Sequence, residues 1–399
     1  MHVAHILAGL EKHYGGPPRV AAGLGSALAD RGVKVSYWSL APGDRDGLIE
    51  TGDQTHLFPL ATPRGWFRSP ELIRELSQEI EGIDLLHLHG IWTYPQFAAA
   101  RLARRGDKPY LIIPHGELEP WRVRQKGRLK FIKKKAYLSL VGLRFLNQAA
   151  CLQAGTSREI EGFRSIGYRG PVTVVPNGVN PELFRHLPDP RLAEEFWPAL
   201  KGRRVVLFFS RLNSEKGLDQ LIPAWARLKN RTGYEDALLV LSGPEDRGYG
   251  PIVTSLIQRC RVASQILLTG IGQELQNMAL ISRADLYTLP SHSEGFSISI
   301  LENLAAGKPV LITPGCNFPE VAKAGAGLSV KPVAEEIETG LRKLLDLSPE
   351  ARQKMGERGR KLIRDNYTWD IAARKMITVY RAILNKEPIP LYPEPVGNI

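Results

Sequence analysis

The sequence predicts an α/β protein of two domains, each built on a mainly parallel sheet with helices on both faces. Three observations predict this class. The chain has 399 residues, too many for one ordinary core and right for two domains of roughly 150–200 residues each. Hydrophobic residues make up 43% and charged residues 24%, which allows a normal core and differs from a disordered chain. Short apolar runs alternate with helix-like stretches along most of the chain.

The first half begins as a strand–helix–strand unit. Residues 3–7 are apolar, residues 19–29 have helical periodicity that Gly32 ends, and residues 33–40 are again strand-like. Further strands, separated by stretches of helical periodicity, are expected at 85–88, 110–113, 150–153 and 172–175. Such runs are typical of parallel strands whose two faces are both buried.

A second alternating series follows an irregular segment. Residues 176–190 contain the turn signal Asn177-Gly178 and several prolines, so we place the domain junction there. Strands are then expected at 204–209, 238–241, 266–268, 286–289 and 310–312, and closing helices near 333–345, 349–364 and 369–384. The predicted layout is a first domain over 1–185, a second over 186–366, a C-terminal helix over 367–386 that packs back toward the first domain, and a proline-rich tail over 387–399 that we expect to be disordered.

Charge and cysteine content narrow the class of partner and compartment. The net charge of +12 implies attraction to an anionic partner. Three widely separated cysteines have no metal-ligand spacing and suit reduced thiols. The N-terminal run has no basic leader, and no later stretch is long and apolar enough to span a membrane. We therefore expect a cytoplasmic protein without a metal or a cofactor.

The strongest motif follows the strand at 286–289. It runs Ser293-Glu294-Gly295-Phe296-Ser297-Ile298-Ser299-Ile300-Leu301-Glu302 and opens a helix. A helix N-terminus offers free N–H groups and a partial positive charge, and the carboxylates of Glu294 and Glu302 can accept hydrogen bonds from sugar or ribose hydroxyls. Helix initiation and a solvated helix face would explain the same two carboxylates.

A second motif follows the strand at 204–209. It runs Ser210-Arg211-Leu212-Asn213-Ser214-Glu215-Lys216-Gly217 and also precedes a helix. Ligands of such sheets bind beyond the carboxyl ends of the strands. Arg211 and Lys216 there suit a diphosphate leaving group, whose growing charge they would stabilise in the transition state without a metal. Ordinary surface charges beside a loop would give the same two residues.

Together these segments resemble the retaining family four of the nucleotide-sugar glycosyltransferases, which has the GT-B fold of two Rossmann-like domains facing across a cleft. The resemblance covers nearly the whole chain. Its further elements, in the order of the family and at strand ends, are Gly15-Gly16-Pro17, Pro114-His115-Gly116, Pro176-Asn177-Gly178-Val179 and Ser242-Gly243-Pro244.

The resemblance implies an acceptor-side first domain, a donor-binding second domain and transfer with retention by front-side attack. Glu294 would bind the donor sugar, Glu302 the ribose, and Arg211 with Lys216 the diphosphate. His115 would line the sugar pocket, although a lone histidine is often structural. By the resemblance, the catalytic residues are His115, Arg211, Lys216 and Glu294, and the donor-binding residues are Gly15, Gly16, Ser210, Gly243, Gly295, Phe296, Ser297 and Glu302.

Two segments fit the resemblance less well. Residues 314–320 stand where the family often has a more glycine-rich donor loop, which leaves Glu320 without an assigned role. Asp44-Arg45-Asp46 has the form of the acidic metal motif of the other major glycosyltransferase fold, but it lies in a polar loop. We interpret it as a solvated turn.

Much of the positive charge is concentrated in residues 121–145. This segment contains no acidic residue, and its bases are interleaved with aromatic and aliphatic side chains: Arg122, Arg124, Lys126, Arg128, Lys130, Lys133, Lys134, Lys135 and Arg144. The pattern predicts a basic amphipathic helix on an anionic membrane surface, at the inner face of the cytoplasmic membrane, and a lipid-linked or other glycan acceptor. An ordinary solvated face, or a soluble acceptor carrying a diphosphate, would also explain it. No nucleic-acid motif accompanies the charge, so nucleic acid is not predicted as a partner.

Two other functions compete with a glycosyltransferase. A nucleotide-sugar epimerase of related fold would need a diphosphate site but would act on the donor with no acceptor present. A non-catalytic module that docks through the basic helix would leave the placement of the Arg211, Lys216, Glu294 and Glu302 motifs unexplained. By the resemblance, the expected role is in surface-polysaccharide assembly.

Overall fold

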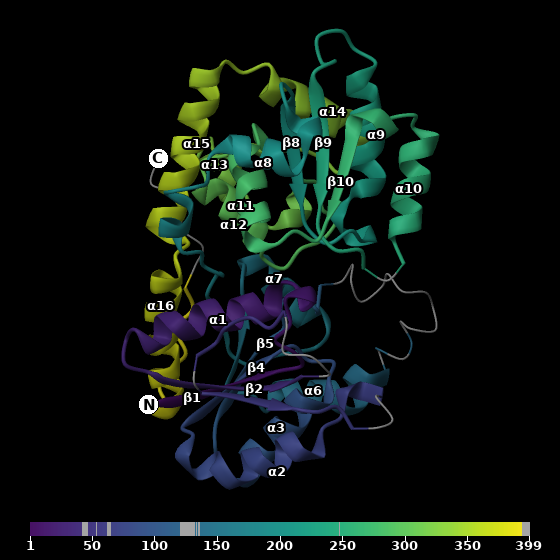
Figure 1. Cartoon of the computed structure of the whole chain (residues 1–399). Coiled ribbons are helices and arrows are strands. Elements are labelled where there is room, and N and C mark those ends of the chain that lie inside the picture. Colours follow the sequence, from purple (N-terminus) through teal and green to yellow (C-terminus); the bar gives the residue numbers. More distant parts are fainter. Residues whose placement is uncertain are drawn as a thin grey trace. The chain divides into compact units, whose positions relative to one another are not determined.

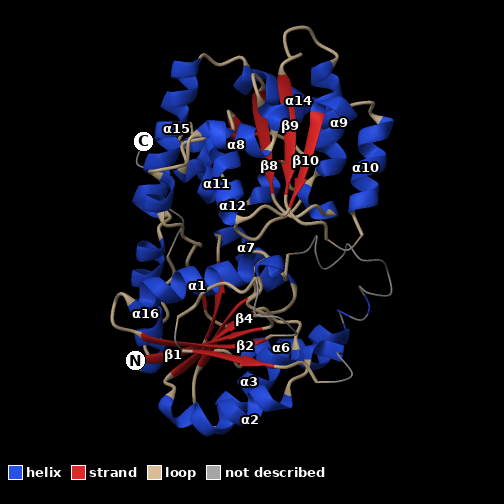
Figure 2. Cartoon of the chain, viewed as in Figure 1, coloured by secondary structure: helices blue, strands red, loops and turns tan. Residues whose placement is uncertain are grey.

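The computed structural model describes residues 1–41, 47–52, 54–61, 65–119, 132, 134, 136–246 and 248–392. The chain divides into two compact units. Unit 1 contains residues 1–178 and the segment that begins at Trp369, and unit 2 contains residues 179–368. Each unit is a parallel sheet (red in Figure 2) between layers of helices (blue in Figure 2). The predicted fold class is confirmed.

Unit 1 has a seven-stranded sheet in the order β3-β2-β1-β4-β5-β6-β7. All its pairings are parallel. The strands are β1 (His2–Leu7), β2 (Lys34–Leu40), β3 (Thr55–Phe58), β4 (Leu85–His89), β5 (Tyr110–Ile113), β6 (Cys151–Ala154) and β7 (Val172–Val174). The α-helices described in this unit are α1 (Gly16–Ala29), α2 (Pro70–Glu79), α3 (Tyr94–Arg105), α6 (Leu143–Asn147), α7 (Ser157–Ser165) and α16 (Trp369–Leu384).

The two faces of the sheet in unit 1 carry separate cores. Val3 and Leu7 of β1 point toward α1 and α16, which pack against each other. Ala4 and Ile6 point the other way, toward α2 and α3. Figure 1 shows α1 and the pair α2 and α3 on opposite sides of the strands. The alternation follows from the two-residue repeat of a strand, so His5 shares its face with Val3 and Leu7.

Unit 2 has a six-stranded sheet in the order β10-β9-β8-β11-β12-β13. Its strands are β8 (Arg204–Phe209), β9 (Ala237–Ser242), β10 (Ile266–Gly270), β11 (Leu286–Leu289), β12 (Val310–Ile312) and β13 (Gly327–Ser329). Its helices are α8 (Pro190–Phe196), α9 (Leu218–Lys229), α10 (Gly250–Arg259), α11 (Glu274–Arg283), α12 (Ile298–Ala305), α13 (Glu320–Lys323), α14 (Ala334–Leu345) and α15 (Pro349–Asn366). Helix α14 packs on α9, whereas α11 packs on α8 and α12 on α15 (Figure 1).

Three expectations about the backbone need correction. Helix α1 begins at Gly16, earlier than predicted, because Pro17 and Pro18 occupy its first turn, where proline is tolerated. The short strands β3 and β13 were not predicted. The expectation of a disordered tail is wrong for residues 388–392, since Thr173 Oγ1 donates a hydrogen bond to the Pro390 carbonyl at 2.8 Å and the ring of Tyr392 lies near Lys375.

Other expectations fall outside the described residues. The solvated turn Asp44-Arg45-Asp46 lies there, as does most of the predicted basic helix over 121–145. Within that segment the structure describes a π-helical turn, Leu138–Gly142, and the start of α6. Among the described residues, no helix has both the length and the apolar character needed to cross a membrane.

Candidate functional site

Two glycines bring three loops together at the carboxyl edge of the sheet in unit 2. Gly217, after β8, has φ of +72°, and a Cβ atom there would lie 2.0 Å from the Pro290 carbonyl oxygen after β11. Gly243, after β9, has φ of +138°, and a Cβ atom would lie 2.1 Å from the carbonyl oxygen of Ser210. Glycine alone tolerates both the backbone conformation and the close approach. The loops that carry the predicted residues are therefore in direct contact.

Lys216 and Glu294 form a buried ion pair between two of these loops. Lys216 Nζ lies 2.5 Å from Glu294 Oε1, and each side chain is only 7% exposed. Ser291 Oγ donates a second hydrogen bond to the same oxygen at 2.6 Å. The backbone of Glu294 is held as well, because its N–H donates to the Gly315 carbonyl and its carbonyl accepts from Asn317 Nδ2. The pair is a fixed, internally neutral arrangement.

Arg211 is held by a carboxylate of its own. Its guanidinium Nη1 lies 3.0 Å from Asp246 Oδ2, and Asn213 Nδ2 donates to the same oxygen at 3.2 Å. The side chain of Arg211 is 30% exposed, so this pair is more open to solvent than that of Lys216. Asp246 lies in the loop after β9, and Ser210, which precedes Arg211, donates its backbone N–H to the Ser242 carbonyl. Both predicted cations are therefore anchored at strand ends.

The loop after β11 leads directly into helix α12. Ser297 is the N-cap residue of this helix, and Gly295 precedes Phe296 in a buried part of the loop. The ring of Phe296 packs edge-on against Phe318 at 4.9 Å between centroids. Glu302 lies in the second turn of α12 and is half-buried. The arrangement directs a helix N-terminus, with its partial positive charge, to the same edge of the sheet as the cations.

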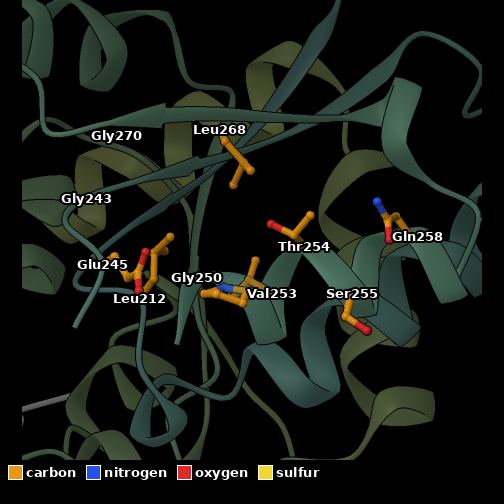
Figure 3. Close-up of a pocket in the computed structure, with 11 residues that line it drawn as sticks. Leu212, Gly243, Glu245, Gly250, Val253, Thr254, Ser255, Gln258, Leu268 and Gly270 are labelled. Carbon is orange, nitrogen blue, oxygen red and sulfur yellow. The ribbon is translucent and has the colours of Figure 1, made fainter. Parts of the chain in front are cut away.

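A pocket of about 560 Å³ adjoins the loop of Arg211 (Figure 3). Leu212 and Glu245 line it on one side, and helix α10 contributes residues on the other. The remaining lining residues are Gly243, Gly250, Pro251, Val253, Thr254, Ser255, Gln258, Leu268 and Gly270. Its volume lies in the range of about 300–1,000 Å³ that small-molecule sites have. Of the predicted residues, Gly243 lines this pocket.

The predicted residues of unit 1 lie at the carboxyl edge of the other sheet. Gly15 has φ of +81° and Gly16 begins α1, so glycine is required at position 15 for its backbone conformation. His115 follows β5 and has φ of +52°, which is uncommon for a residue other than glycine. His115 Nε2 lies 3.0 Å from Nδ1 of His89, the last residue of β4.

His89 belongs to a cluster of buried histidines that the sequence analysis did not single out. His5 Nδ1 lies 2.9 Å from His89 Nε2, and His87 Nδ1 lies 2.7 Å from the hydroxyl of Tyr380 on α16. His5 and His87 are completely buried. Burial lowers the pKa of His5 to about 3 and holds the pKa values of His87 and His89 well below the usual histidine value.

The structure brings together part of the predicted set. Lys216 contacts Glu294. Arg211 follows Ser210 in the loop whose next residue, Leu212, lines the pocket. Glu302 is on helix α12, which Glu294 precedes. Gly15, Gly16 and His115 are in unit 1. Glu320 is buried at the start of α13. Sequence reasoning missed Asp246 and Ser291 because each is recognised only by the partner it contacts. It also missed the histidine pair of β4, although alternation along a strand places His87 and His89 on one face.

Comparison with known proteins identifies both halves of the chain. Residues 14–183 match the family model described as Glycosyltransferase Family 4, and residues 193–362 match the model described as Glycosyl transferases group 1. An uncharacterized glycosyltransferase of Methanocaldococcus jannaschii is 28% identical over 330 residues, which cover 79% of this chain and 80% of that protein.

Two further similarities bear on the activity and on the fold. A GDP-mannose-dependent α-(1-6)-phosphatidylinositol monomannoside mannosyltransferase of Mycobacterium tuberculosis is 28% identical over 232 residues, 54% of this chain and 57% of its own length. The sucrose-phosphate synthase of Thermosynechococcus elongatus has a similar fold, with a TM-score of 0.74 at 21% identity over 97% of this chain and 100% of that one. These matches favour neither an epimerase nor a non-catalytic module.

Proposed function

We propose a donor site, a mechanism and an acceptor class for this chain, which belongs to the family 4 glycosyltransferases of the GT-B fold and transfers a sugar from a nucleotide-diphosphate donor. The donor would lie at the carboxyl edge of the sheet in unit 2, and the sugar would be transferred with retention of its anomeric configuration. The observation that carries this assignment is the buried pair of Lys216 and Glu294.

The pair suits a donor because its two members meet opposite ends of the reacting bond. The ammonium of Lys216 and the guanidinium of Arg211 stabilise the charge that grows on the departing diphosphate. The carboxylate of Glu294 accepts hydrogen bonds from hydroxyls of the donor sugar. Each cation has a carboxylate partner before the donor arrives, Glu294 or Asp246, so the donor meets a site whose charges are already in place.

The reaction then needs no protein nucleophile. The acceptor oxygen attacks the anomeric carbon on the face from which the diphosphate leaves. As the new carbon–oxygen bond forms, the bond to the phosphate oxygen breaks, and the acceptor proton passes to the departing diphosphate. The two cations supply the charge stabilisation that a metal ion supplies in other phosphate sites.

The remaining predicted residues hold the rest of the donor. The pocket beside Leu212 takes the nucleoside, because its volume fits a base and it adjoins the loop of Arg211. Glu302 accepts hydrogen bonds from the ribose, and Gly243, Gly295, Phe296 and Ser297 form the surrounding backbone. His115, Gly15 and Gly16 are the contribution of unit 1 to sugar binding.

A thermal-shift screen tests the donor site. The purified chain would be heated with UDP, GDP or ADP, and with their sugar conjugates, in the absence of added metal; one nucleotide series should raise the melting temperature. Lys216→Met should abolish that shift, whereas the matched control Lys354→Met, an exposed lysine of unit 2, should keep it. No shift in the unmodified chain at millimolar nucleotide would contradict the donor site.

For the acceptor we infer a lipid-linked glycan or surface-polysaccharide intermediate, reached from an anionic membrane surface. Residues 121–145 carry nine basic and no acidic residues, interleaved with aromatic and aliphatic ones. Among the residues of this segment that the structure describes, Ile132 is 60% exposed and Lys134 Nζ lies 5.1 Å from the ring centroid of Trp92. The similar mycobacterial enzyme, by its name, acts on a phosphatidylinositol mannoside.

Vesicle flotation tests this inference. Each lysine or arginine near an anionic surface contributes about 1 kcal/mol to the free energy of membrane binding. Changing Lys133, Lys134 and Lys135 to alanine should therefore weaken binding to phosphatidylserine-containing vesicles about 100-fold. The control changes the same charge in unit 2, with Lys331, Lys343 and Lys354 changed to alanine. Equal binding by both triple variants would remove the membrane role and favour a soluble acceptor that carries a diphosphate.

A further inference from the structure

Three histidines of unit 1 lie together on one face of its sheet. His5 of β1 is paired in register with His87 of β4, and His89 follows two residues later on the same face. The ring centroids of His5 and His87 are 4.8 Å apart, and those of His87 and His89 are 4.6 Å apart. Helix α16 covers this face, where the Tyr380 hydroxyl bonds to His87.

Two of these histidines connect to His115 through a single path of hydrogen bonds. His5 Nδ1 bonds to His89 Nε2 at 2.9 Å, and His89 Nδ1 bonds to His115 Nε2 at 3.0 Å. Both nitrogens of His89 are thus engaged with other histidines. His115 stands at the sheet edge with φ of +52°, and a residue held in this sparsely populated region often has a functional role.

All hydrogen bonds along this path must donate in the same direction, because His5 and His89 are neutral. Burial keeps the pKa values of His5 and His89 far below neutral pH, so each ring carries one N–H group and one bare nitrogen. A donor on one side of His89 therefore requires an acceptor on the other. The proton position on His115 Nε2 is set by the proton position on His89, which is set in turn by His5.

The far end of the path selects that direction. Among the described residues, His5 Nε2 is buried and has no hydrogen-bond partner. A proton there would be a buried N–H group without an acceptor, which proteins rarely contain. The proton of His5 therefore belongs on Nδ1, where it is donated to His89, and His89 in turn donates its Nδ1 proton to His115 Nε2.

We propose that His89, backed by His5, is a positioning residue that fixes the ring of His115 and holds its proton on Nδ1. This role rests on the proposed function of His115 in the sugar pocket. In that tautomer His115 cannot donate from Nε2, and its Nδ1–H group is the one that can act as a hydrogen-bond donor. The proposal makes buried strand residues, with no contact to the donor, a determinant of how His115 meets the sugar.

A metal ion among His5, His87 and His89 is the competing explanation. One nitrogen from each lies within 4.8 Å of the others, so the three rings are close enough to be considered as ligands of one ion. Both nitrogens of His89 are already hydrogen-bonded. The cluster contains no carboxylate among the described residues, so an ion would keep its full charge in a buried site.

Nitrogen NMR of the full chain labelled with ¹⁵N-histidine reads the tautomers directly. A protonated ring nitrogen and a bare one have well-separated shifts. We expect His115 to show a protonated Nδ1 and a bare Nε2 at pH 8, where an ordinary imidazole is neutral. A protonated Nε2 in the unmodified chain would overturn the proposal, as would one equivalent of bound metal whose removal changes the shifts of His5 and His87.

Three variants separate positioning from packing. His89→Leu removes the donor to His115, so His115 should become a mixture of tautomers and kcat should fall about 10–100-fold, as on loss of other outer-shell partners. His89→Asn retains an N–H donor near the former Nδ1 and should restore one tautomer and most of kcat. His87→Leu is the matched control, equally buried on the same strand face but outside the path, and should leave the His115 tautomer unchanged.

The outcomes distinguish this proposal from the proposed function. If His89→Leu folds and the His115 tautomer does not change, the positioning role is wrong. If His89→Leu does not fold, His5→Leu tests the same path from its far end, with the same expected mixture and the same contradicting result. A chain with the expected tautomers but no sugar transfer from any donor would instead contradict the role of His115 in catalysis.

Discussion

The two sheets end in different chemistry at their carboxyl edges. In unit 2 the groups there are charged and paired in advance, as with Lys216 and Glu294 or Arg211 and Asp246. In unit 1 the buried groups behind the edge are neutral imidazoles, whose pKa values burial lowers. The same strand arrangement thus supports ionic interactions in one unit and directional hydrogen bonds between neutral groups in the other.

Under the proposed function, this difference would divide the chemical tasks of the reaction between the two units. A departing diphosphate gains negative charge, and fixed cations stabilise that change most effectively. Sugar hydroxyls are neutral, and they are recognised by donors and acceptors with defined directions. A histidine path with one proton per ring supplies direction without net charge. Experiments that perturb the histidines of unit 1 or the charged pairs of unit 2 separately therefore test this difference between the units.

The largest expected effect is a selective acid sensitivity of unit 1. The folded pKa of His5 is about 3, whereas its unfolded value is near 6.5, so between these values the unfolded state binds more protons. The contribution of neutral His5 to the free energy of unfolding is therefore fully present above about pH 6.5 and is lost as the pH falls toward 3. Linkage gives about 2 kcal/mol at pH 5 for His5. Protonation of His87 and His89 adds to this loss, because burial lowers their pKa values as well.

Hydrogen exchange followed by mass spectrometry measures this effect. From pH 7.5 to pH 5, after correction for intrinsic rates, peptides of β1 and β4 should lose more protection than peptides of β8 and β11. His87→Leu should reduce the acid sensitivity, because it removes one of the three buried histidines. Equal loss in both units would show that the histidines do not distinguish them.

The next effect concerns the charged pair of unit 2. Lys216→Met should lower kcat about 10²–10³-fold, as loss of one transition-state charge contact does. It also leaves the carboxylate of Glu294 buried without its cation, which should cost about 3–5 kcal/mol in the free energy of unfolding. Steady-state kinetics and thermal unfolding of the same preparation measure the two effects.

A double variant separates these two effects. Lys216→Met with Glu294→Gln replaces both charges and should recover most of the stability, because the buried charge is gone. It should not recover kcat. Recovery of turnover in the double variant would mean that Lys216 acts only by neutralising Glu294.

A smaller effect is expected at Arg211, whose pair is more exposed. Arg211→Ala should lower kcat/KM about 10–100-fold, since a second cation still contacts the diphosphate. The free energy of unfolding should change by less than about 1 kcal/mol, as for other solvent-accessible pairs. Asp246→Asn is the control, because it keeps the guanidinium and should reduce kcat/KM less than Arg211→Ala does. The reverse order would assign the larger role to Asp246.

The smallest effect tests the pocket. Thr254→Phe fills space between α10 and the loop of Leu212 and should weaken binding of the donor nucleotide about tenfold, which is about 1.4 kcal/mol. Ile252→Phe adds the same ring on α10 at a position that is 50% exposed and does not line the pocket. Calorimetric titration of both variants compares them, and equal dissociation constants would place the nucleoside elsewhere.

Most of the fold was predictable because its signals are local. Buried strands such as residues 204–209 and helices such as residues 349–364 are recognised from the repeat of their apolar residues and from the turn residues at their ends. Strand β3, Thr55–Phe58, has two polar residues followed by two apolar ones at a sheet edge, and β13, Gly327–Ser329, has only three residues. Neither is long enough for its pattern to stand out, and both are defined by the strand beside them.

The candidate site was predictable in part, for the same reason. Lys216 and Glu294 stand in motifs at strand ends, so the sequence indicated where each lies, but their contact depends on the approach of two loops that Gly217 permits. Asp246 and Ser291 have no signal of their own. His5 and His89 are 84 positions apart, and only the pairing of β1 with β4 brings them together.

The order of synthesis has a consequence for unit 1, because that unit includes helix α16, which follows all of unit 2 in the sequence. Met376, Val379 and Tyr380 of α16 belong to the same core as Val3 and Leu7. On the ribosome, the sheet face that carries His5 and His87 therefore has α1 but lacks α16 until after all of unit 2 has been made. Unit 2 is therefore synthesised completely before unit 1, and the acid-sensitive histidines of unit 1 are enclosed only after α16 has been made.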